Sequence, residues 1–159
     1  MARQVQIRLA EPDDATAISG VLYESFVEYK ALYTDQGFAA TTRGKERIEA
    51  RMREGPVWMA SRDGVTVGTV SAVARGGTVY IRGMAVGPVA RGSGAGSALL
   101  KQVERWAATE RATRIFLSTT PFLESAIRLY ENFGFRRTSD GPFDLFGTPL
   151  FTMEKNLSR

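Results

Sequence analysis

The sequence contains neither cysteine nor histidine among its 159 residues. Without cysteine, the chain can form no disulfide, no thiolate nucleophile, no thiolate zinc site and no iron–sulfur cluster. Without histidine, it lacks the commonest general base, the commonest metal ligand and the Ser-His-Asp arrangement. Any chemistry must therefore come from carboxylates, tyrosines, backbone amides or a cofactor, and we expect no metal site.

Long apolar runs are also absent. No stretch approaches the roughly 18 uncharged apolar residues of a membrane span, and the N-terminus has no apolar run of signal-peptide length. We therefore expect a cytoplasmic protein with no membrane partner. Because 43% of the residues are hydrophobic and 24% are charged, the composition is that of a globular chain, and its length predicts one domain over residues 1–159.

The formal net charge is +4, from 21 basic and 17 acidic residues. The basic residues are spread along the chain and interleaved with aspartate and glutamate. A nucleic-acid partner is therefore less expected than a solvated surface or a small anionic cofactor.

Hydrophobic periodicity predicts a mixed α/β domain with one central sheet. We expect strands at residues 5–9, 57–61, 65–73, 78–86, 114–118, 135–139 and 149–155, and helices at about 11–29, 42–54, 94–109 and 120–133. Residues 33–42 are typical of a loop, and the charges on the second helix indicate a solvated face. The order β-α-α-β-β-β-α-β-α-β-β predicts a mostly antiparallel sheet of about seven strands with flanking helices. Because a helix joins strands 78–86 and 114–118, these two should run parallel.

A glycine-rich turn connects strand 78–86 to the next helix, with glycines at 87, 92, 94 and 96. Free N–H groups and the macrodipole at the start of a helix favour a phosphate there. Two known fingerprints fail: Ser97 stands where the dinucleotide pattern needs glycine or alanine, and Ser93 where the nucleoside-triphosphate loop needs lysine. The alternative is a flexible loop without a ligand.

The remaining pattern, Arg91-x-x-Gly94-x-Gly96 after Met84-Ala85-Val86, closely resembles the signature of the GNAT superfamily of N-acetyltransferases. A second GNAT signature is matched at residues 126–135, which read Ala-Ile-Arg-Leu-Tyr-Glu-Asn-Phe-Gly-Phe. The resemblance implies a GNAT-like domain that uses acetyl-CoA as co-substrate. It also implies transfer of the acetyl group to a primary amine of a small molecule or peptide.

The same resemblance implies where the coenzyme binds. The backbone of Met84, Ala85 and Val86 would pair with pantetheine like an added strand. The diphosphate would lie against the following segment, with the Arg91 side chain close to its charge: Arg91, Gly92, Ser93, Gly94, Ala95, Gly96 and Ser97.

Tyr130 matches the GNAT tyrosine that donates a proton to the departing thiolate, and a thiolate leaving group needs an acid in any case. The alternative is that it only packs on its helix. The base is less clear, because strand 78–86 has no carboxylate; the candidates are Tyr80 and Glu28, with Glu24 and Asp35 as further options. Leu123 occupies a position that is commonly asparagine in this family, which puts one polar contact to the coenzyme in doubt.

The acceptor pocket, by analogy with the family, would be formed by Tyr29, Tyr33 and Phe143, with Phe38 and Phe146 as further walls. Asp35 and Asp144 are candidates to attract a cationic amine. With no cysteine for an acyl-enzyme, we expect direct attack in a ternary complex. Two alternatives stay open: a non-catalytic acyl-CoA-binding or regulatory module, and a nucleic-acid-binding domain. Because GNAT proteins are often dimers, a homodimer is a further expectation.

Overall fold

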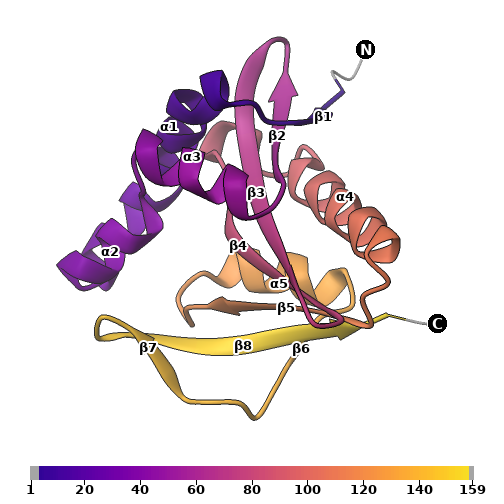
Figure 1. Cartoon of the computed structure of the whole chain (residues 1–159). Helices are drawn as coiled ribbons and strands as arrows, with labels where there is room; N and C mark the ends of the chain where they lie inside the picture. The colour runs from indigo at the N-terminus through magenta and orange to yellow at the C-terminus, as the bar shows by residue number, and fades with distance from the viewer. Residues whose placement is uncertain (1–3, 158–159) are drawn as a thin grey trace.

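Three consecutive strands form the antiparallel centre of the sheet: β2 (Val57–Arg62), β3 (Val65–Arg75) and β4 (Thr78–Val86) (Figure 1). The turns that join them, Asp63-Gly64 and Gly76-Gly77, have positive φ at both central positions, as a tight hairpin turn of type I′ requires. The meander predicted from the sequence is confirmed, and it creates the long strand β4 that leads into the glycine-rich turn.

The computed structural model describes residues 4–157. Their eight strands form one sheet in the order β1-β2-β3-β4-β5-β8-β6, with β7 paired to β8. The further strands are β1 (Gln6–Leu9), β5 (Arg114–Thr119), β6 (Arg136–Arg137), β7 (Phe143–Leu145) and β8 (Thr148–Asn156). Only β4 and β5 pair in parallel, so the prediction of a mixed, mostly antiparallel sheet is confirmed.

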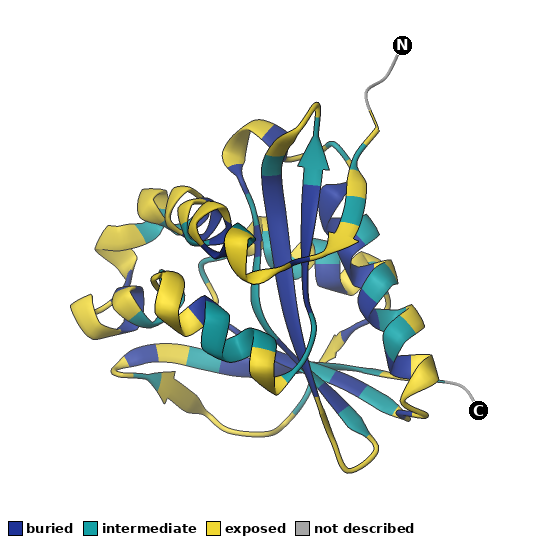
Figure 2. Ribbon diagram, turned by 45° about the horizontal axis from the view of Figure 1, so that its top comes forward, coloured by how far each residue is buried: buried dark blue, intermediate teal, exposed yellow. Residues whose placement is uncertain are grey.

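Helices cover both faces of this sheet. On one face, α1 (Ala15–Phe26) and α3 (Lys45–Glu54) enclose a core that includes Ile18 and Ile48. On the other, α4 (Ala95–Thr109) and α5 (Glu124–Asn132) enclose a larger core around Leu99. The middle strands are therefore buried along most of their length (Figure 2).

Several element boundaries differ from the prediction. Residues 33–42 are not a loop: Thr34 accepts a hydrogen bond from the Gly37 amide at 3.0 Å and caps a short helix, α2 (Asp35–Thr41). The first helix begins and ends as 3₁₀ turns, η1 (Pro12–Asp14) and η2 (Val27–Leu32), and a third, η3 (Pro88–Ala90), follows β4.

The C-terminal part of the sheet holds two more differences. The segment between the predicted strands 135–139 and 149–155 contains β7, which folds back on β8 through Phe146 and Gly147, both with positive φ, and brings the strands to eight rather than about seven. Helix α5 begins at Glu124 rather than at Thr120, because residues 120–123 form a turn closed by the Leu123 amide on the Thr120 carbonyl at 3.2 Å. Among residues 4–157, no helix has the length and apolarity needed to cross a membrane.

Candidate active site

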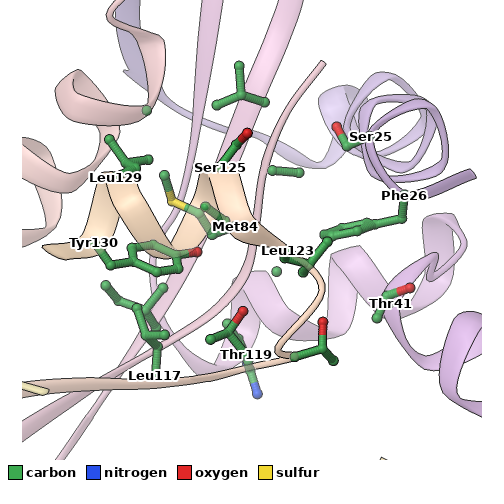
Figure 3. Close-up of a pocket in the computed structure, with 18 of the residues that line it drawn as sticks. Ser25, Phe26, Thr41, Met84, Leu117, Thr119, Leu123, Ser125, Leu129 and Tyr130 are labelled. Atoms are coloured by element: carbon green, nitrogen blue, oxygen red, sulfur yellow. The ribbon is translucent and has the colours of Figure 1, made fainter. Parts of the chain in front are cut away.

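The parallel strands β4 and β5 separate after three paired residues. Their pairing begins at Thr78 with Arg114 and ends at Tyr80 with Phe116, whereas β4 continues to Val86 paired with β3 as its only strand partner among the described residues. A cavity of about 700 Å³ lies between the two strands, and residues from α1, α3, α4 and α5 also line it (Figure 3). From Ile81 to Val86, one edge of β4 thus faces the cavity, and the backbone groups along this edge are not paired with another described strand.

A β-bulge shapes this edge. Ser71 of β3 pairs with Arg82 and Thr69 pairs with Ala85, so that Gly83 and Met84 together oppose the single residue Val70. Gly83 has φ +62, a conformation that favours glycine. Met84, the second residue of the bulge, lines the cavity, and Figure 3 shows its side chain there.

At the end of β4 the glycine-rich turn leads into α4. Gly92 and Gly94 adopt φ of +81 and +89, and an added Cβ would meet nothing within 4 Å at either position, so conformation rather than crowding requires glycine there. Among the residues described, the amides of Gly92, Gly94, Gly96 and Ser97 donate to no protein acceptor. Together with the positive end of the α4 macrodipole, these free amides fit the diphosphate of a coenzyme.

Close packing joins the start of α4 to α5. A Cβ at Gly96 would lie 2.6 Å from Cδ2 of Leu129, closer than carbon atoms pack. Glycine at 96 therefore lets the two helices approach, and Tyr130, the residue after Leu129, is held beside the turn.

Tyr130 is 6% exposed and lines the cavity. Its ring packs against Phe135 with centroids 5.9 Å apart, and Figure 3 shows the phenol oxygen directed into the space between Met84 and Leu123. Burial raises the pKa of Tyr130 above the ordinary value, and the nearby Tyr33 raises it further. At neutral pH this phenol is protonated and can donate a proton.

Arg91 and Glu28 are brought together, but not in the arrangement expected from the sequence. The Arg91 guanidinium forms an ion pair with Glu28 and donates to the Ser25 carbonyl at 3.3 Å. Arg91 lines the cavity, whereas Glu28 lies outside its lining. The arginine thus joins the turn to the end of α1 and to η2.

Besides Tyr130, three predicted tyrosines line the cavity: Tyr80, Tyr29 and Tyr33. The ring of Tyr80 stacks on that of Phe116, with the ring centroids 5.0 Å apart. Burial raises the pKa of Tyr33 to about 12. Phe143 is 51% exposed and does not line the cavity.

The two predicted carboxylates, Asp35 and Asp144, also lie outside the lining of the cavity. Asp35 is exposed in the first turn of α2. Asp144 instead accepts a hydrogen bond from the Gly147 amide at 2.6 Å, within the turn between β7 and β8.

Sequence reasoning missed a group of arginines. Arg43, Arg47 and Arg51 stand at intervals of four, which places them on one face of α3 and the residues before it, and all three line the cavity together with Arg82 of β4. The sequence predicts a solvated face for the charges of this helix, and for these three arginines that prediction is wrong. The regular spacing of the three arginines is the signal in the sequence that could have indicated otherwise.

The fold and the cavity define an acyltransferase-type domain, and comparison with known proteins identifies its family. Residues 21–135 match the model of the acetyltransferase (GNAT) family. The chain therefore belongs to the GNAT family, and the resemblance noted at residues 84–96 and 126–135 is confirmed.

Solved structures of low sequence identity share the fold. PaiA N-acetyltransferase from Thermoplasma acidophilum, in complex with coenzyme A, is 18% identical with a TM-score of 0.82, over 97% of this chain and 99% of that chain. The yncA protein from Salmonella typhimurium, solved with acetyl-CoA, is 24% identical with a TM-score of 0.73, over 98% and 95% of the two chains.

A curated relative matches over a shorter stretch. N-acetylaspartate synthetase from Danio rerio is 36% identical over 85 residues, which make up 52% of this chain and 30% of the relative. The alignment thus covers less than a third of the relative's length.

Proposed function

We propose that this chain transfers the acetyl group of acetyl-CoA to a primary amine of a small molecule or peptide, by direct attack in a ternary complex. The observation that carries the proposal is the opening between β4 and β5, with unpaired backbone along one side and free amides at its end. Tyr130 borders the same cavity. Membership of the GNAT family and the coenzyme-bound neighbours support it.

In this proposal the coenzyme follows β4. The amides of Gly92, Gly94, Gly96 and Ser97 bind the diphosphate. The apolar side chain of Leu123 offers the coenzyme no polar contact. The amide-rich pantetheine arm pairs with the edge formed by Met84, Ala85 and Val86, as an added strand would. Its thioester then lies in the cavity that Tyr130 borders. The pairing of Arg91 with Glu28 holds the turn in place.

The reaction needs one nucleophile and one acid. The amine nitrogen attacks the thioester carbonyl carbon, and a new C–N bond forms. As the tetrahedral intermediate collapses, the C–S bond breaks and the departing sulfur takes the proton of the Tyr130 phenol. The attacking nitrogen loses one proton. Water takes this proton. Tyr80 lines the cavity and can relay the proton by accepting it on its hydroxyl while giving up its own, whereas Glu28 is paired with Arg91.

The test is acetyl transfer to a panel of amines. Purified protein is incubated with acetyl-CoA and each amine, and both the free thiol of coenzyme A and the acetylated product are measured. Release of thiol together with product supports the proposal. Binding of acetyl-CoA without transfer to any amine would favour the non-catalytic module, and absence of binding would contradict both. The cytoplasmic location and the homodimer stay predictions.

A further inference from the structure

Four arginines gather on one wall of the cavity. Arg43, Arg47 and Arg51 project from α3 and the residues before it, and Arg82 projects from the facing strand β4. Among the described residues that line the cavity there is no aspartate or glutamate. The wall therefore carries positive charge without an acidic residue within the cavity to balance it. We call these four residues the arginine wall.

Most of this charge has no partner in the protein. Arg82 forms an ion pair with Glu54 at 2.6 Å. The side chains of Arg43, Arg47 and Arg51 form no ion pair or hydrogen bond with any residue in the range 4–157. Arginine carries five donors in a planar fork that matches a carboxylate, and such donors are rarely left without an acceptor when partly buried.

Arg51 occupies the central place in the wall. A Cβ at Gly83 would lie 2.5 Å from Nη1 of Arg51, so the guanidinium rests directly on the bulge of β4. Burial, and the positive charges of Arg82, Arg43 and Arg47, lower the pKa of Arg51 to about 10. An anion placed against these groups would relieve both effects, since an opposite charge nearby favours the protonated form.

The position of the wall separates it from the coenzyme's phosphates. Gly83 precedes Val86, the last residue of β4, by three residues, a distance of about 10 Å at a rise of ~3.3 Å per residue. The diphosphate site follows later still, at the free amides of residues 92–97. In coenzyme A the adenosine and its phosphate lie on the far side of the diphosphate from the thioester. The anion at the arginine wall is therefore not a phosphate of the coenzyme.

We propose that the arginine wall binds a carboxylate of the acceptor, so that the acceptor is a small aminocarboxylic acid rather than a polyamine or a lysine-rich peptide. This inference rests on the proposed acetyl transfer and names its substrate class. It replaces the expectation that Asp35 and Asp144 attract a cationic amine, because neither lines the cavity. A carboxylate on the acyl group of the donor would present the same chemistry, and the experiment separates the two sources.

The experiment compares matched acceptors that differ only in a carboxylate. Aspartate and glutamate are set against their fully amidated forms, with spermidine as a cationic acceptor, and kcat and KM are measured for each with acetyl-CoA. The acids should exceed their amides in kcat/KM by tenfold or more. Equal or better rates with the amides or with spermidine would overturn the proposal.

Variants then locate the anion. Arg51→Met keeps an apolar stem of similar length and removes the charge. We expect it to raise the KM for the acid at least tenfold while leaving the KM for acetyl-CoA and the rate with the amide unchanged. Arg47→Met, at a more exposed position, tests the same wall if Arg51→Met folds poorly. Arg53→Met is the matched control, because Arg53 is exposed on the same helix and does not line the cavity. An equal loss with acid and amide in the Arg51 and Arg47 variants would contradict the assignment.

Two further arms complete the design. If the wild type prefers succinyl-CoA to acetyl-CoA and loses that preference in Arg51→Met, the carboxylate belongs to the donor and the proposal is overturned. If no acceptor is acetylated at all, acetyl transfer fails separately, and calorimetric titration with aspartate and with its diamide decides the anion site. Binding of aspartate that is weakened in Arg51→Met but not in Arg53→Met supports the site, and equal binding of acid and diamide excludes it.

Discussion

At the level of single residues, Tyr130 combines two properties that the proposed chemistry needs. It borders the cavity, and its burial keeps the phenol protonated. Removing only the hydroxyl, by Tyr130→Phe, should slow kcat about tenfold or more while the Kd for acetyl-CoA stays unchanged. Steady-state kinetics and equilibrium titration measure the two quantities. Tyr23→Phe, at an exposed tyrosine outside the cavity, is the control and should alter neither. Unchanged turnover in Tyr130→Phe would leave the tyrosine a packing residue.

The raised pKa values of the tyrosines also predict how the rate depends on pH. Burial raises the pKa of Tyr130 and that of Tyr33, the latter to about 12, so both phenols keep their protons through pH 10. The attacking amine, in contrast, must lose a proton. We therefore expect kcat/KM to rise with pH as the amine deprotonates, without a decline up to about pH 10. A decline between pH 8 and 10 that is absent from Tyr130→Phe would show that the phenol ionises earlier than burial implies.

At the level of elements, the contact between α4 and α5 depends on the absence of a side chain at Gly96. A methyl group there would meet Cδ2 of Leu129 at 2.6 Å, so Gly96→Ala should lower the free energy of unfolding by about 1 kcal/mol. In a Leu129→Ala background the same change should cost nothing, because the clashing atoms are gone. Gly20→Ala, where nothing lies within 4 Å in α1, should instead stabilise by about 0.5–1 kcal/mol. Denaturant titration measures all four variants. Stabilisation by Gly96→Ala in the wild-type background would contradict the proposed helix contact.

The elements also show how far the sequence could predict this molecule. The meander and the turn into α4 were predictable because Asp63-Gly64, Gly76-Gly77 and the glycines at 92 and 94 require backbone conformations that few other residues adopt. Helix α2 was not, since its cap depends on a threonine whose hydroxyl also contacts Phe146 and Thr148, more than a hundred residues away. Periodicity located helix α3 but could not tell which charged face is solvated. That depends on how α3 crosses β4, so the arginine wall was missed.

At the level of the whole molecule, the sheet consists of two parts with little direct connection. Strands β1 to β4 form one part, β5 to β8 form the other, and three residue pairs between β4 and β5 join them. A ligand that lies between β4 and β5 contacts both parts and adds to the connection between them. Since it binds the folded state alone, it should raise the stability of the entire domain.

This gives a prediction for thermal unfolding. Acetyl-CoA at about a hundred times its Kd should add roughly 2.7 kcal/mol to the free energy of unfolding, which for a domain of this size is a rise in Tm of about 5–10 °C.

Fragments of the coenzyme and other ligands are the controls. ADP reaches only the free amides and S-acetyl-pantetheine reaches only the strand edge, so each should give a smaller rise in Tm at the same concentration. NAD should give no larger rise than ADP, because Ser97 breaks the dinucleotide fingerprint. A DNA oligonucleotide should give none, because the basic residues are dispersed along the chain. A rise with DNA that disappears on adding salt would instead favour a nucleic-acid partner. If ADP alone matched acetyl-CoA, the edge of β4 would contribute nothing to binding, and the pantetheine would not lie between the strands.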